Sequence, residues 1–203
     1  MTTVTSKLES VNIMLTSIGE SPVNTITSST TTDVSIAIQI LDNVSREVQS
    51  VGWHFNSDTN YKLSKNTAGE VELPSNALRV DNSNNDADKD LVERNRKLWD
   101  RENHTFIINK DIRVNITWYL EFTELPETAR RYITIRAARI FQDRMLASET
   151  LHTFHQVDEL QALSALKEHE GDTRDHSIFD NYSTYRVIDR DNYQPMKTTI
   201  NDE

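Results

Sequence analysis

The chain has no cysteine among its 203 residues, which excludes disulfide bonds and thiolate metal sites. Glycine is also scarce, and its four residues are too far apart to form a phosphate-cradling loop such as G-x-G-x-x-G. The motifs G-x-S-x-G and H-E-x-x-H are missing as well. The sequence thus lacks these signatures of nucleotide-dependent enzymes, serine hydrolases and zinc proteases. We predict no catalytic residue, no metal and no cofactor.

Apolar residues are few, at 36% of the chain, below the roughly 45–50% typical of a compact domain. Such polarity indicates either a solvated tail or surfaces that make polar contacts with other subunits. The net charge of −10 disfavours a nucleic-acid-binding protein and suits one that lets DNA pass without holding it. No apolar run approaches a membrane span and no signal peptide precedes the first helix, so we expect synthesis in the cytoplasm and no membrane partner.

Hydrophobic periodicity predicts two helices before residue 53. Ser6 and Glu9 have the spacing of a capping box, and Gly19 is placed to end the first helix. Asp33 is expected to cap the second helix, which Gly52 ends. The predicted apolar stripes are Leu8, Val11, Leu15 and Ile18 in the first helix, and Val34, Ile38, Leu41, Val44, Val48 and Val51 in the second.

The middle third of the chain predicts a small, mostly antiparallel sheet. Residues 113–122 alternate between apolar and polar with a period of two, which is typical of a half-buried strand. Shorter strand candidates, separated by turn-rich stretches, lie at residues 53–55, 77–80, 97–99 and 105–108.

Two further helices are predicted after the sheet. Pro126 suits the first turn of the third helix, and Gly171 is placed to end the fourth, which begins near Glu149. The expected buried stripes are Ala129, Ile133, Ala137, Ile140, Phe141 and Met145 in the third helix, and Leu151, Phe154, Val157, Leu160, Leu163 and Leu166 in the fourth.

These elements predict an α+β fold in which a discontinuous four-helix lobe carries an inserted small, mostly antiparallel β-sheet lobe. We expect the helical lobe at residues 1–52 and 124–180, the β lobe at 53–123 and a polar C-terminal tail at 181–203. The tail contains Tyr182, Tyr185 and Tyr193. Two interpretations stay open, because these aromatics belong either to a frayed terminus or to a segment that orders on a partner.

Two clusters could carry chemistry. His152, His155 and Glu159 are spaced to share one face of the fourth helix and could bind a metal, although an ordinary solvated face is the favoured interpretation. Glu121, Glu124 and Glu127 gather at the junction of strand and helix, and a glycoside hydrolase needs two such carboxylates. In an acidic chain clusters of this kind arise by chance, and Glu127 would also complement the helix dipole.

The third helix is rich in arginine. Arg130, Arg131, Arg136 and Arg139 lie in it, and two functions are conceivable for them, DNA binding or ion pairing with neighbouring helices or subunits. The acidic net charge favours ion pairing. We therefore predict that these four arginines contribute to subunit interfaces, together with the three tyrosines of the tail. In a ring of subunits joined head to tail, faces of opposite sign would set the register.

Several stretches of the sequence, in the same order along the chain, resemble a known protein family. The sequence S-V-N-I-M-L-T-S-I-G-E-S-P-V, from Ser10 to Val23, is similar to the opening helix and I-G-E-x-P-V turn of the tail tubular protein A family of T7-like podophages. The stretch 40–56 resembles that family's helix and its G-W-x-F-N entry into the sheet. Further similar stretches follow in the same order, at 98–100, 116–122, 124–127, 131–133 and 137–139, so the resemblance covers roughly residues 8 to 180.

The resemblance implies a structural virion protein of the tail and not an enzyme. It implies a twelve-fold adaptor ring beneath the portal protein, with the sheet lobe toward the nozzle protein, tail tubular protein B, and with tail fibres attached near that junction. DNA would leave through the ring without specific binding. Two alternatives from the residues remain, a tail-associated glycan hydrolase that uses the glutamates and a DNA-binding module that uses the arginine-rich helix.

Overall fold

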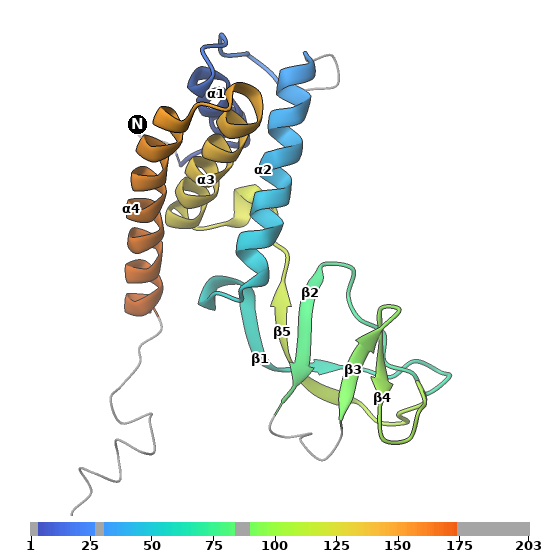
Figure 1. Ribbon diagram of the computed structural model, residues 1–203. Helices are drawn as coiled ribbons and strands as arrows, with labels where there is room; N and C mark the ends of the chain where they lie inside the picture. Colours follow the sequence, from blue (N-terminus) through green and yellow to red (C-terminus); the bar gives the residue numbers. More distant parts are fainter. Residues whose placement is uncertain (1–3, 27–30, 84–89, 174–203) are drawn as a thin grey trace, which may run out of the picture.

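The computed structural model describes residues 4–26, 31–83 and 90–173. Within these residues, four α-helices form one lobe and short strands form a second lobe, which is inserted between the second and third helices (Figure 1). The predicted α+β fold, with its discontinuous helical lobe and inserted sheet lobe, is confirmed. The helices are α1 (Lys7–Ser17), α2 (Thr32–Ser50), α3 (Glu127–Leu146) and α4 (Glu149–Thr173).

The ends of α1 and α2 follow the sequence signals in part. The Ser6 hydroxyl accepts a hydrogen bond from the backbone N–H of Glu9 at 3.1 Å, and Gly19 follows the helix with a positive φ of 84°. The Ser6 half of the predicted capping box and the stop at Gly19 are confirmed. The prediction that Asp33 caps α2 is wrong, because Thr31 occupies that position and Asp33 lies in the first helical turn. There its charge complements the positive end of the helix dipole.

The core of the helical lobe lies among α1, α2 and α3, each of which packs against the other two. The predicted stripe of α2 is largely buried, with Val34 and Leu41 fully covered. Val51 is the exception at 62% exposure, because it is the C-cap residue beyond the last helical turn. The stripe of α3 is likewise buried at Ala129, Ile133, Ala137 and Phe141, whereas Met145 near the helix end is exposed.

Of the six apolar residues predicted to be buried along α4, three are not, since Phe154, Val157 and Leu160 are 68%, 51% and 59% exposed. A residue advances about 100° around a helix, so a repeat of three falls behind by about 60° at each step. Over the six predicted residues from Leu151 to Leu166 this drift adds up to about 300°, so the six cannot all share one face. The face toward α3 carries Leu166, whose predicted burial is confirmed, together with Glu159 and Ala162, and α4 runs past the predicted end at Gly171 to Thr173.

The sheet lobe centres on the strand that the sequence predicts best. β5 (Ile112–Trp118) lies between β1 (Ser57–Leu63) and β2 (Ala77–Asn82) and is antiparallel to both. Its inward residues Ile112, Val114 and Ile116 are at most 1% exposed, as the alternation predicts. A separate antiparallel hairpin consists of β3 (Leu91–Arg94) and β4 (Lys97–Asp100).

Other parts of the predicted sheet differ from the structure. The stretch 53–55 leads into a 3₁₀ turn, η1 (His54–Asn56), and residues 105–108 make isolated bridges. The strand predicted at 113–122 ends at Trp118, because Phe122 begins a second 3₁₀ turn and packs into the helical core. The polar strand β1 was not predicted, since only Leu63 among its residues is buried.

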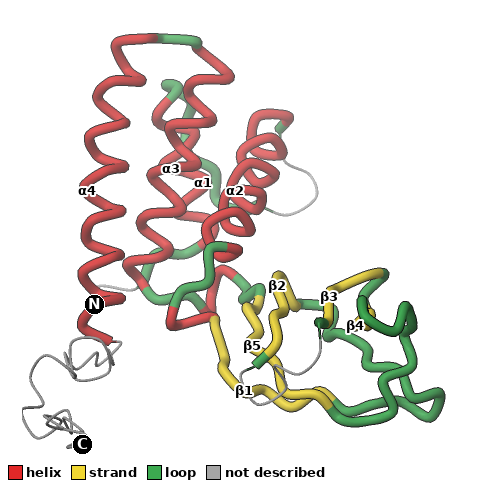
Figure 2. The backbone as a smooth tube through the Cα atoms, turned by 60° about the horizontal axis from the view of Figure 1, so that its bottom comes forward, coloured by secondary structure: helices red, strands yellow, loops and turns green. Residues whose placement is uncertain are grey.

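Hydrogen bonds tie the end of α2 to the exit of β5, where the two lobes meet. The Asn56 amide donates to the carbonyl oxygens of Gln49 and Trp118, at 2.9 and 2.8 Å. The Gln49 side chain in turn donates to the Leu120 carbonyl at 3.0 Å and accepts from the Leu120 N–H at 2.8 Å. These bonds hold the sheet lobe at the lower end of the helical lobe, from which it extends to one side (Figure 2).

Candidate functional site

Helix α4 is held against α3 by a buried carboxylate. Glu159 is 8% exposed and lies on the face of α4 that packs on α3. Its two oxygens accept hydrogen bonds from Arg136 Nη1 at 3.1 Å and from Arg139 Nε at 2.5 Å. Arg136 also reaches α2, where its Nη2 lies 2.6 Å from Glu47 Oε1. One arginine thus links three helices, and these polar contacts fix which face of α4 turns outward.

The surroundings of Arg136 keep it charged. Burial disfavours the charged form, but the Tyr132 hydroxyl, which accepts a hydrogen bond at 3.2 Å, and the charges of Glu47 and Glu159 raise the pKa of Arg136 above its ordinary value. A buried ion pair adds little net stability, whereas removing one partner leaves a charge without compensation. The cluster therefore stabilises one orientation of α4 against the others.

The outer face of α4 carries the three exposed residues Phe154, Val157 and Leu160, here called the α4 stripe. Asp158 is the one charged side chain among the exposed residues from 153 to 165, a stretch that the structure describes completely. The whole chain is 27% charged. Protein interfaces are poor in charge at their centre and rich in aromatic and aliphatic anchors. The α4 stripe has this composition.

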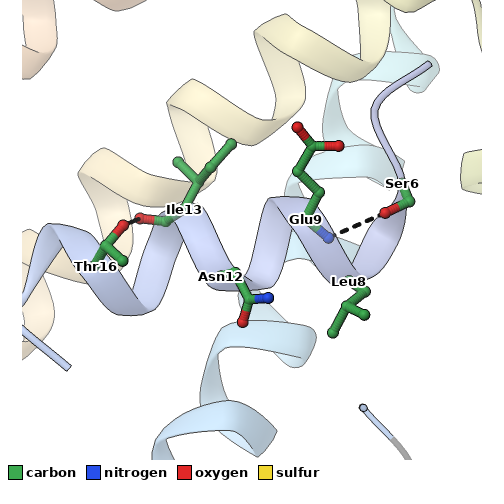
Figure 3. Close-up of a pocket in the computed structure, with 6 residues that line it drawn as sticks. All are labelled: Ser6, Leu8, Glu9, Asn12, Ile13 and Thr16. Carbon is green, nitrogen blue, oxygen red and sulfur yellow. Dashed lines mark hydrogen bonds between the residues drawn. The ribbon is translucent and has the colours of Figure 1, made fainter. Parts of the chain in front are cut away.

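A shallow groove of 340 Å³ runs along α1. Leu8 and Asn12 line one side of it and Glu9 and Ile13 the other (Figure 3). The Asn12 amide is already bound to the backbone N–H and carbonyl of Val23. The apolar part of the groove lining therefore remains available to a partner. It includes Ile13, which is 41% exposed. The complete lining, here called the α1 groove, is Ser6, Leu8, Glu9, Asn12, Ile13 and Thr16.

The structure places the predicted arginines differently from one another. Arg130 is 8% exposed and donates to the backbone carbonyls of Leu125, Thr5 and Thr123. Arg136 and Arg139 bind Glu159 of the neighbouring helix, whereas Arg131 is exposed. Their part in subunit interfaces stays a prediction. Tyr182, Tyr185 and Tyr193 lie outside the described residues.

The candidate carboxylates serve local structure. The Glu127 carboxylate accepts hydrogen bonds from the backbone N–H and the hydroxyl of Thr5, at 2.8 and 2.5 Å. Glu124 Oε2 accepts from the backbone N–H of Glu121 at 2.9 Å, which closes the 3₁₀ turn. The Glu127 contacts connect the segment before α1 to the start of α3, so two of the three carboxylates have structural partners.

The candidate metal ligands are also separated. Glu159 binds the two arginines, and His152 Nδ1 lies 2.8 Å from Asp143 Oδ2 at the turn between α3 and α4. Across residues 4–26, 31–83 and 90–173, no group of three His, Asp or Glu side chains is arranged to hold a metal. In the same residues, no helix is both long and apolar enough to cross a membrane.

The tip of the sheet lobe has a polar cavity of 500 Å³ beside the β3–β4 hairpin. The Arg94 guanidinium lies 4.9 Å from the centre of the Trp99 ring, and Arg101 pairs with Asp90 at 3.1 Å. Glu102 and His104 complete the lining. Asp90 and Glu102 balance Arg94 and Arg101 in the lining, so the cavity has no net positive charge that would select an anionic ligand such as nucleic acid.

Sequence reasoning missed the α4 stripe and the α1 groove as surfaces. The sequence did contain a signal for the exposure of the α4 stripe. The strict spacing of three from Phe154 to Leu160 places these residues on a different side of the helix from Leu166. The signal for the α1 groove was Ile13, an apolar residue that lies outside the predicted buried stripe of the first helix and is exposed on its opposite face.

Comparison with protein families matches residues 8–176 to the family described as tail tubular protein. The match runs from the first turn of α1 through the whole sheet lobe and beyond the end of α4. A search of the curated proteins returned no match.

Proposed function

The chain belongs to the tail tubular protein family, and on this premise we propose that it forms the adaptor ring between portal and nozzle in a short-tailed phage. Family membership makes it a structural protein of a phage tail. In the proposed ring, twelve copies enclose the channel through which DNA is ejected, and tail fibres dock at its edge. The proposed partners are further copies of the chain, the portal protein, the nozzle protein and the tail fibre, assembled after synthesis in the bacterial cytoplasm.

The α4 stripe is the observation that carries the ring proposal. A soluble monomer rarely keeps neighbouring aromatic and aliphatic side chains uncovered on a face that is poor in charge. Covering a Leu or Phe side chain completely stabilises a protein by about 1.5–3 kcal/mol. Phe154, Val157 and Leu160 are each more than half exposed, so a neighbour that covers them would gain about 1 kcal/mol from each.

Charge supports a channel that DNA passes through. The net charge of −10 repels phosphate, and Arg130, Arg136 and Arg139 are engaged within the subunit. These three arginines therefore offer little to a DNA backbone. We assign the proposed contacts with portal and neighbouring copies to residues 1–52 and 124–180, and the contact with the nozzle to 53–123. Arg131 and the tail 181–203 are the proposed additional interface elements.

The mass of the purified protein, measured by light scattering with and without its portal, tests this function. We expect a large closed oligomer, or a monomer that becomes one on the portal. A chain that stays monomeric both alone and with portal present would contradict the ring. Incubation with host polysaccharide is the companion measurement, and release of reducing sugar that Glu124→Ala and Glu127→Ala abolish would favour the hydrolase instead.

A further inference from the structure

We propose that the α4 stripe of each subunit packs into the α1 groove of the next copy around the ring. The inference rests on the proposed ring and adds the two surfaces that meet in it. Both surfaces belong to the helical lobe, but they lie on helices with different neighbours. α4 packs on α3, whereas α1 packs on α3 and α2.

A ring requires two different surfaces on every subunit. A contact that uses the same patch on both partners gives a two-fold dimer, and only contact between unlike patches continues around a closed ring. Pairing of one α4 stripe with another would therefore end assembly at two copies. The stripe needs a different apolar acceptor on the neighbouring chain, and the α1 groove offers one with Leu8 and Ile13 in its lining.

The two surfaces match in length. From Phe154 to Leu160 the stripe extends about 9 Å along its helix, and from Leu8 to Thr16 the groove extends about 12 Å, at 1.5 Å per residue. The groove is shallow, with 340 Å³ along the surface of α1. A shallow groove of this length suits a helix laid alongside α1, since ridges of side chains on one helix pack into the grooves of another.

Both surfaces are apolar at their centre and poor in charge. Each carries one carboxylate, Glu9 in the groove lining and Asp158 on the outer face of α4 between 153 and 165, so the contact must keep these two like charges apart at its rim. The exposed Gln161, which flanks the stripe, supplies amide donors that suit the Glu9 carboxylate. An apolar centre with few charges and a polar rim is the composition that protein interfaces share.

Cysteine cross-linking tests the contact directly, because the natural chain contains no cysteine. The test variant is Ile13→Cys combined with Leu160→Cys in the full-length chain, oxidised under conditions in which light scattering detects the oligomer. We expect a ladder of disulfide-linked species on a non-reducing gel, which a reductant collapses to a single band. A mixture of the two single variants should stop at dimers, and neither single variant alone should cross-link.

The outcomes separate this inference from the ring itself. An oligomer that yields no disulfides in the double variant would overturn the α4–α1 contact and leave the ring proposal standing. Dimers formed by Leu160→Cys alone would overturn it in favour of a two-fold contact between α4 helices. A chain that remains monomeric, alone and with portal, would overturn both proposals.

A second variant needs no cross-link. Phe154→Gln combined with Leu160→Gln should shift the oligomer to monomer, while the thermal unfolding of the monomer stays unchanged because both side chains are exposed. Ile107→Gln is the matched control, since Ile107 is 54% exposed but lies in the sheet lobe. Its oligomer should persist. Persistence of the oligomer in the double glutamine variant would contradict the proposal.

Discussion

Helices α2 and α4 carry apolar residues in similar number, yet they turn them to opposite sides. α2 buries Val34, Leu41 and Val48 in the core, whereas α4 exposes Phe154 and Leu160. In α2 the apolar residues repeat every three or four positions and stay on one face. In α4 they repeat every three positions and rotate around the helix, so the buried face is left to Glu159, Ala162 and Leu166.

The difference teaches how each helix is oriented. Apolar burial orients α2, because its stripe packs against α1 and α3. In α4 the short apolar patch of Ala162 and Leu166 packs into that core. Ion pairs add to it, because the Glu159 carboxylate must meet Arg136 and Arg139 to be buried at all. A helix held in this way keeps an apolar face available for a neighbour, as a subunit of an assembly requires.

The largest expected difference in the free energy of unfolding is between two truncated leucines, one on each helix. Leu41→Ala on α2 should lower the free energy of unfolding by about 3 kcal/mol, because the side chain is fully buried and its removal leaves a cavity. Leu160→Ala on α4 should lower it by less than about 0.5 kcal/mol in the monomer. Urea unfolding of both variants measures the contrast. Equal losses in the free energy of unfolding would mean that Leu160 is buried like Leu41, which would contradict the outward orientation of the α4 stripe.

A smaller effect is expected at the polar junction. Glu159→Ala should cost about 2 kcal/mol, because Arg136 and Arg139 lose their buried partner while remaining partly accessible to water. The neighbouring Asp158→Ala is the control and should change stability by less than about 0.5 kcal/mol, since Asp158 is exposed. If Glu159→Ala and Asp158→Ala both have the same free energy of unfolding as the wild type, the Glu159 ion pairs do not hold α4 in place.

The smallest effect is expected from a half-buried ion pair in the sheet lobe. The Lys97 ammonium, 2.6 Å away, holds the pKa of Glu70 below its ordinary value of 4.5, and Glu70 raises the pKa of Lys97. Folded protein thus binds the Glu70 proton more weakly than unfolded protein does. The contribution of the pair is complete above pH 4.5 and disappears as the pH falls through the lowered pKa.

Thermal unfolding of Glu70→Gln between pH 7 and pH 3 measures this contribution. The small stability difference from the wild type should shrink as the pH falls. A difference that grows with acidity would show the opposite sign of linkage and contradict the pairing.

Local signals in the sequence predicted several elements correctly. The Ser6 cap, the stripe of α2 and the alternation at Val114 and Ile116 each depend on neighbours within one turn or one strand, so spacing alone specifies them. β1 was missed because it is polar along most of its length and shows no alternation. Its place in the sheet comes from pairing with β5, which is distant in sequence.

The candidate site depended on contacts that spacing cannot specify. The arginines of α3 were noticed, but their pairing with Glu159 joins residues twenty or more positions apart across two helices. Likewise, the outward turn of the α4 stripe follows from that pairing and from the drift of a three-residue repeat. Composition indicated an assembly, whereas the surfaces that form it required the three-dimensional arrangement.

Thiol labelling of two single variants tests the outward orientation of the α4 stripe most directly. In Leu160→Cys the new thiol should react at nearly the rate of a free thiol, at protein concentrations low enough for a monomer. In Leu166→Cys, at a position that is fully buried against α3, labelling should wait for unfolding. Rapid labelling of the Leu166→Cys variant together with protection of the Leu160→Cys variant would contradict the account.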